Sequence, residues 1–195
     1  MEYKPNDLFV GVIDFFGILV PGAVLMLLHG QYLISLLGVC EVPQDKVFVW
    51  IGFFIGSLLL GHFLTGMSVL LLNRAHGMSF GDVDRYYREV EQQISVPVAR
   101  NRKAAYHRAY SFIRLNSTAG IAEIDRQVAE YKLFRSLTIA FLIDLGFAIA
   151  ALDVRHIIFS TLIALLSWYR FASLVCWTQQ VTFEYYVLLT GANRN

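Results

Sequence analysis

Charge is scarce in this sequence, and it is missing altogether from long runs. Only 16% of the 195 residues are charged and 56% are hydrophobic, whereas soluble domains carry about a quarter charged residues. The stretch from Val47 to Asn73 holds no Asp, Glu, Lys or Arg, and it exceeds the roughly 20 residues that cross the hydrocarbon core of a bilayer. A soluble core would spread its charges through every element, so the sequence predicts a membrane protein.

The familiar motifs of enzymes and metal sites are also missing. The sequence has no phosphate-binding glycine loop, no GxSxG elbow, no HExxH helix and no His and Cys cluster at metal-ligand spacing. We therefore expect no cofactor and no metal. The two cysteines, Cys40 and Cys176, are expected on opposite sides of the membrane, which excludes a disulfide within the chain. Cys40 could instead join two subunits if its loop faces an oxidising periplasm.

What the sequence does contain is four apolar stretches of helical length. We predict an all-α integral membrane protein with spans at about 8–28, 47–72, 136–152 and 157–177. Residues 1–73 form a first transmembrane hairpin, 74–135 a helical insert, and 136–195 a second hairpin with a tail. The apolar run near the N-terminus is too long for a cleaved signal peptide and no small-x-small site follows it.

Arginine and lysine set the predicted orientation, because they gather on the cytoplasmic side of membrane proteins. The loop between spans one and two offers only Lys46. We therefore expect a multi-pass protein of a bacterial inner membrane, with the insert and both termini in the cytoplasm. The insert is much richer in these cations, which are Arg74, Arg85, Arg88, Arg100, Arg102, Lys103, Arg108, Arg114, Arg126, Lys132 and Arg135.

The insert is expected to hold three helices, because breakers fall at 95–97 and 116–120. Ser117 or Thr118 could cap the third, which is expected to run on into span three. This helix carries an apolar stripe that must be buried, either against neighbouring subunits of a homo-oligomer or against the other insert helices. The stripe consists of Ile121, Ile124, Val128, Tyr131 and Phe134.

Four polar side chains are predicted at hydrocarbon depth, where a charge costs about 2.5–3.5 kcal/mol. They are Asp14, His62, Asp144 and Arg170. They either line an ion pathway near the cytoplasmic side or form buried pairs that fix helix register. Asp144 and Arg170 lie about 13 and about 21 Å from the turn at 153–156, and this offset of about 8 Å is near the limit of an arginine's reach. His62 is either a hydrogen-bonded core residue or a proton relay.

Glycines on span two predict a surface for close helix packing. Gly52 and Gly56 form a small-xxx-small pair, and Gly66 falls within roughly 40° of Gly52 on the same face. In span one, Pro21 and Gly22 should kink or loosen the helix.

The most basic part of the insert runs through Arg100, Arg102 and Lys103. Such a face could bind lipid head groups, an acidic soluble partner or RNA, although the net charge of +1 gives no general sign of a nucleic-acid binder. Arg102 and His107 also match the R-x(4–6)-H spacing of HEPN-type ribonucleases, in which arginine and histidine act in acid–base attack on RNA. A second subunit would complete such a site.

Size, predicted topology and the segments FFGILVPGA, RNRKAAYH and EYKLFRSL resemble the small ancillary membrane proteins of prokaryotic antiviral islands. These include the accessories of type VI-B CRISPR effectors and of RADAR defence systems. The resemblance implies a membrane-bound modulator or effector of phage defence, and one branch of that group is associated with oligomeric pores and a divergent R-x(4–6)-H motif. This sequence has more apparent spans than that branch.

We therefore expect an oligomeric, pore-forming or membrane-perturbing protein. The alternative is a membrane scaffold that recruits or restrains a soluble defence protein through its basic insert.

Overall fold

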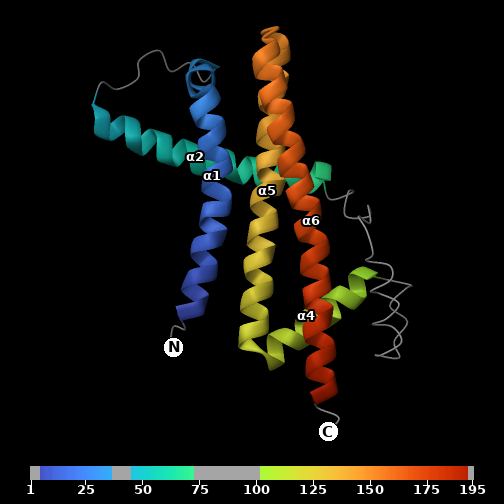
Figure 1. The fold of residues 1–195 in the computed structure, drawn as a ribbon. Helices are drawn as coiled ribbons and strands as arrows, with labels where there is room; N and C mark the ends of the chain where they lie inside the picture. The colour runs from blue at the N-terminus through green and yellow to red at the C-terminus, as the bar shows by residue number, and fades with distance from the viewer. Residues whose placement is uncertain (1–4, 37–44, 73–101, 193–195) are drawn as a thin grey trace.

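Long helices make up the described chain. The computed structural model describes residues 5–36, 45–72 and 102–192, which hold five helices and no strand. Four of these helices are long and apolar enough to cross a membrane, which confirms the predicted all-α fold with four helices of membrane-spanning length. The first predicted insert helix lies outside the described residues. The helices in Figure 1 are α1 (Pro5–Leu36), α2 (Lys46–Leu72), α4 (Arg102–Asn116), α5 (Thr118–Ala150) and α6 (Val154–Ala192).

Polar caps start three of these helices where the apolar runs begin. Asp45 accepts a hydrogen bond from the backbone N–H of Val47 at 2.9 Å before α2. Ser117 accepts one from Gly120 N–H at 3.0 Å and caps α5. Asp153 accepts bonds at the first turn of α6. Each cap satisfies backbone donors that the helix itself leaves unpaired.

Helices α1, α5 and α6 run side by side, whereas α2 crosses them at a steep angle (Figure 1). A hydrophobic cluster of Leu25 on α1, Leu64 on α2, and Ile139 and Ala140 on α5 lies where the three helices meet. The described ends of α1 and α6 nearest the chain termini both lie away from the α5–α6 turn (Figure 1). α4 packs across the lower parts of α5 and α6, where Ala109 and Phe183 are buried together.

Helices α5 and α6 extend well beyond the predicted spans. α5 is one unbroken helix of 33 residues, so the predicted third insert helix and span three are continuous. α6 has 39 residues and continues past the predicted span end at 177 through most of the predicted tail. At about 1.5 Å per residue these helices are about 50 and about 58 Å long, and the hydrocarbon core is about 30 Å thick.

α6 packs against part of the apolar stripe on α5. Ile124 is fully buried, Tyr131 contacts Phe171 with 6.3 Å between ring centroids, and Arg170 lies over the Phe134 ring. For Tyr131 and Phe134 the packing partner is therefore α6 of the same chain, rather than the other insert helices or a neighbouring subunit.

Candidate functional site

A carboxylate with two imidazoles forms the most polar site inside the helices that could span a membrane. The Asp144 side chain is 0% exposed. His29 Nε2 lies 2.7 Å from its Oδ1, and His156 Nε2 lies 3.0 Å from each carboxylate oxygen. The Ser160 hydroxyl donates to Oδ2. We call these four residues the Asp144 cluster.

Three helices bring the Asp144 cluster together near the α5–α6 turn. Asp144 lies six residues before the end of α5, and His156 and Ser160 lie one turn apart at the start of α6. α1 reaches the same level and supplies His29, whose ring stacks on Phe147 at 4.3 Å. The packing of α1 on the α5–α6 hairpin therefore completes the site.

The Asp144 cluster places a buried carboxylate between two imidazoles. Each neutral imidazole can donate one N–H bond to the carboxylate, but the buried group then carries one uncompensated negative charge. One imidazolium would make the cluster electrically neutral and form an ion pair with Asp144. The His156 side chain is 35% exposed and that of His29 is 13% exposed, so His156 is the more open of the two to solvent.

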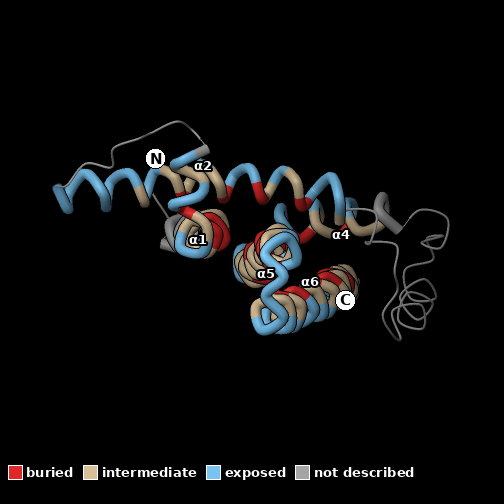
Figure 2. The backbone as a smooth tube through the Cα atoms, turned by 90° about the horizontal axis from the view of Figure 1, so that it is seen from above, coloured by how far each residue is buried: buried red, intermediate tan, exposed pale blue. Residues whose placement is uncertain are grey.

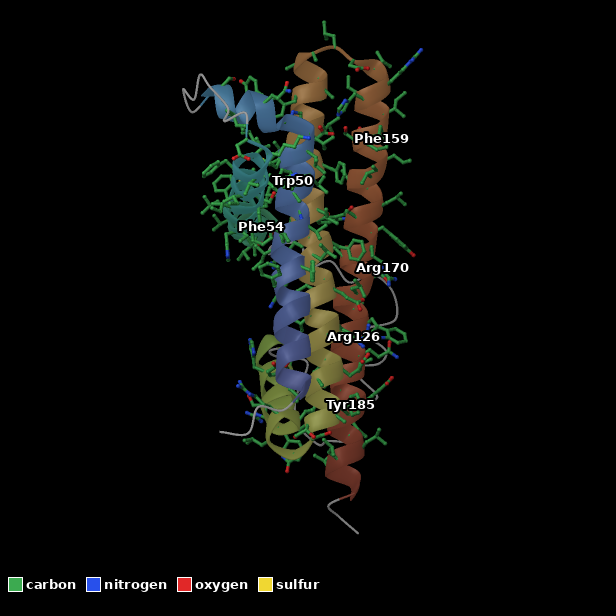
Figure 3. All side chains as sticks on the ribbon, turned by 90° about the vertical axis from the view of Figure 1, so that its left-hand side faces the viewer. Trp50, Phe54, Arg126, Phe159, Arg170 and Tyr185 are labelled. Atoms are coloured by element: carbon green, nitrogen blue, oxygen red, sulfur yellow. The ribbon has the colours of Figure 1, made fainter. Side chains whose placement is uncertain are left out.

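The structure does not form the Asp144–Arg170 pair considered from the sequence. Arg170 is exposed on α6, and its guanidinium carbon lies 6.0 Å from the centroid of the Phe134 ring. Figure 3 shows it along α6 between Phe159 and Tyr185. The two residues fail to meet because Asp144 lies nearer the turn and is already saturated by closer donors.

Two of the partners of Asp144 escaped the sequence reading. His29 follows directly after the predicted end of span one, and His156 was assigned to the turn. The spacing of His156 and Ser160, four residues apart at the start of an apolar helix, was the available signal for a shared face. No comparable signal linked His29 to Asp144, because the register between α1 and α5 is set by tertiary packing.

A second polar layer lies farther from the turn, around Arg135. This side chain is 7% exposed, and its Nε donates to Ser68 Oγ at 2.9 Å. One turn away on α2, Thr65 Oγ1 lies 3.3 Å from Ser136 Oγ. α2 therefore meets α5 through hydroxyls and a buried guanidinium, a role for Arg135 that its place among the cations of the insert did not predict.

The remaining predicted polar residues stand apart from the Asp144 cluster. His62 is exposed on α2, so the prediction of a hydrogen-bonded core histidine is wrong within the chain. Asp14 belongs to α1, and its side chain lies outside the described part.

The helix crossing uses different glycines from those predicted. A Cβ built on Gly61 would overlap the carbonyl oxygen of Ile18, and one built on Gly22 would overlap that of Ser57. Gly52 and Gly66 have no such neighbour within 4 Å, whereas Gly56 would meet Met26 at 3.2 Å.

The prediction for Gly52 and Gly66 is therefore wrong for packing within the chain, because the buried face of α2, which meets α1 and α5, carries Ser57, Gly61, Leu64 and Ser68. α1 also continues through Pro21 and Gly22 as one helix.

The basic residues of the insert lie on or before α4. Arg102 and Lys103 begin this helix, His107 is exposed on it, and Arg100 lies outside the described residues. The side chain of Arg102 lies outside the described part, so its pairing with His107 stays a prediction.

A tyrosine–aspartate bond joins α4 to α5. The Tyr110 hydroxyl donates to Asp125 Oδ1 at 2.7 Å. Burial, together with this bond, raises the pKa of the Tyr110 phenol above its usual value of about 10. The bond thus fixes α4 beside the extension of α5.

The described residues contain no group of three or more His, Cys, Asp or Glu side chains arranged to hold a metal ion. Comparison with known protein families, with curated proteins and with solved structures found no match. The fold and its apolar surface define the class, a multi-pass α-helical membrane protein.

Proposed function

We propose that this chain is the subunit of an oligomeric protein of a bacterial inner membrane, which perturbs the bilayer or forms a conductive path through it in antiphage defence. The observation that carries the proposal is the position of α2. This helix crosses α1 and α5 steeply, and part of it projects beyond the bundle (Figures 1 and 2).

After Lys46, the projecting part of α2 is apolar on every side. Residues 46–52 are all exposed, and Figure 3 shows Trp50 and Phe54 on this helix. A soluble monomer rarely leaves such a continuous apolar surface in water, so lipid or a neighbouring subunit must cover it. The exposed large side chains are Val47, Phe48, Val49, Trp50, Ile51, Phe54 and Ile55.

The steep crossing has a direct consequence in a bilayer. If α1, α5 and α6 stand across the membrane, α2 lies across the acyl chains and displaces lipid from the side of the bundle. A bilayer accommodates such mismatch by local thinning, by tilt of the helices or by subunit association. Both thinning and association favour leakage of ions or small solutes.

The apolar band of the hairpin is also short. From the ends of the hairpin to Arg135 on α5 and Arg170 on α6 there are about 15 and 16 residues, or about 23 Å of helix, against a hydrocarbon core of about 30 Å. Of these two arginines Arg170 is exposed and can reach lipid phosphates, whereas Arg135 is buried against Ser68. The resemblance to antiviral ancillary membrane proteins supports the biological role.

The test is reconstitution of the full chain into liposomes and planar bilayers, with its size measured in detergent. We expect oligomers, dye release and conductance. Phe54→Lys puts a charge on the projecting part of α2 and should abolish release, whereas the matched Leu188→Lys, on the exposed end of α6, should not. A chain that stays monomeric and leaves both membranes tight would contradict the proposal.

A scaffold role is the second candidate, and the exposed basic face of α4 favours it. His107, Arg108 and Arg114 are exposed on this helix, where an acidic partner could dock. Reversing the charges of Arg100, Arg102 and Lys103 would then abolish recruitment, while Asp144→Asn and Arg170→Leu would leave it unchanged. The opposite pattern of effects would favour the pore.

RNA cleavage that is lost in His107→Ala would instead indicate a ribonuclease.

A further inference from the structure

We propose that the Asp144 cluster is a proton-binding site, and that the bound proton holds the end of α1 on the α5–α6 hairpin. This inference concerns the link between α1 and the hairpin, and it stands whether or not the protein conducts.

The first step is the charge of the buried carboxylate. Asp144 is 0% exposed, and its described neighbours within hydrogen-bonding distance are the Ser160 hydroxyl and the imidazoles of His29 and His156. With both imidazoles neutral, the cluster carries one negative charge in a low-dielectric site, which is costly. One added proton cancels that charge, and a second would place two imidazolium rings beside one carboxylate.

The second step is the link between helices. Among the described side chains of α1, residues 15–35, His29 is the one hydrogen-bonded to the hairpin. Its neighbours Phe147 and Tyr32 contribute ring stacking without charge. A proton on the imidazoles turns the contact with the Asp144 carboxylate from a neutral N–H donor bond into an ion pair, in which the positive charge cancels the buried negative one. Loss of that proton weakens the bond and leaves an uncompensated carboxylate that water can hydrate only if α1 moves away.

The third step is access. His156 Nε2 contacts both oxygens of Asp144 at 3.0 Å, and its side chain is 35% exposed. The charged groups nearest to it in sequence are Asp153, whose carboxylate caps α6, and Arg155, which is exposed. Among the described titratable residues of α2, Lys46 and His62 are both exposed. The proton therefore exchanges on the side of the membrane that the α5–α6 turn faces.

The direction of the pH effect follows. Imidazole changes charge between about pH 5 and about pH 8. Below this range the cluster holds its proton and α1 stays docked. As the pH rises through this range the proton is lost, and the end of α1 separates from the hairpin more often.

A distance measurement tests the proposal directly. The full chain, with Cys40→Ser and Cys176→Ser, carries spin labels at Gln31→Cys on α1 and Val154→Cys on α6, two exposed positions. In nanodiscs we expect one narrow distance at about pH 6 and a longer component that grows by a factor of about five or more by about pH 9.

Variants separate a proton from a merely structural bond. His29→Gln keeps a neutral donor but takes up no proton, so its long component should be present at both pH values and should not change. Asp144→Asn should also lose the pH response. His62→Gln, at an exposed histidine outside the cluster, should respond like the parent chain. A parent distance that is independent of pH, or a full pH response in His29→Gln, would overturn the proposal.

Two further measurements guard against misfolding and against another ligand. The ¹⁵N ring signals of histidine in the unsubstituted chain should show an imidazolium at about pH 6 that is lost as the pH rises; two neutral rings at every pH would overturn the proposal. Addition of EDTA at constant pH should leave the distances unchanged. If EDTA instead produces the long component, the ligand is a metal ion and the proton proposal is wrong.

Discussion

At the residue scale, Leu152 in the α5–α6 turn has a backbone conformation that suits glycine. Its φ is 54°, in the left-handed region that costs a side-chain-bearing residue about 1–2 kcal/mol. The side chain is 81% exposed, so it adds little packing within the chain. The tight turn is nevertheless required, because it sets the register that brings His156 to Asp144.

We expect Leu152→Gly to stabilise the fold by about 1 kcal/mol, because glycine adopts this conformation without strain. The measurement is thermal unfolding in detergent, where the apparent Tm should rise. Leu162→Gly is the matched control, since Leu162 is an exposed residue inside α6, and it should lower the Tm. Equal effects of the two substitutions would contradict this explanation.

Tyr110→Phe removes the hydrogen bond that the Tyr110 hydroxyl donates to Asp125 on α5. We expect a loss of about 1–2 kcal/mol, because Asp125 is left without its donor. Tyr169→Phe, at an exposed tyrosine of α6, should change stability by less than about 0.5 kcal/mol.

The same tyrosine predicts a pH effect. The pKa of the Tyr110 phenol is higher in the folded chain than in the unfolded one, so on raising the pH the unfolded chain loses the phenol proton first. The contribution of the protonated Tyr110 to stability is therefore complete below about pH 10. Stability should fall as the pH rises further, and the fall should be smaller in Tyr110→Phe. A loss of stability in alkali that is identical in both chains would contradict this assignment.

At the element scale, the crossing of α1 and α2 depends on two glycines that let backbones touch. Gly61→Ala places a methyl group on the carbonyl of Ile18, and backbone atoms cannot rotate out of the way. We expect a loss of about 2 kcal/mol or more. Gly66→Ala meets open space and should be neutral or stabilising by up to about 1 kcal/mol. Apparent Tm values in detergent distinguish the two, and similar values would show that α2 does not pack in this way.

The same pair of glycines shows what the sequence could predict. Runs with little or no charge located all four long apolar helices, because the length and mean hydropathy of a run can be read directly from the sequence. The choice between Gly61 and Gly66 depends on which face of α2 meets α1, and α2 is too uniformly apolar to reveal that face. Ser57 and Ser68 mark it, but serine is common enough in membrane helices to give a weak signal.

The Asp144 cluster illustrates the same limit. Asp144 could be singled out because a lone carboxylate in an apolar run needs a partner. Counting residues suggested Arg170, but the register between helices gave His29 and His156 instead. The length of α6 was underestimated because its second half is only moderately apolar, and it buries Thr178 and Thr182 with their hydroxyls bonded to backbone carbonyls of the same helix.

At the scale of the whole molecule, the proposed membrane covers only part of α5 and α6. The arginine level described above divides each helix into a segment in lipid and a segment in water. We expect a spin label at Leu162 to be accessible to oxygen, which dissolves in lipid, and one at Leu188 to be accessible to a water-soluble nickel complex. Both positions are exposed in the chain, so the comparison reports surroundings rather than burial. Matching accessibilities at the two positions would place the membrane boundary elsewhere.

Neither α5 nor α6 contains a proline, and each runs as a single helix from the turn to the level of α4. Two continuous helices that pack along their length have no kink that could absorb a tilt. A small rotation of the hairpin near its turn therefore displaces the end beside α4 sideways, and this displacement grows with the length of the helices. The turn end of the hairpin and the end that carries α4 are therefore coupled mechanically by the continuity of two helices.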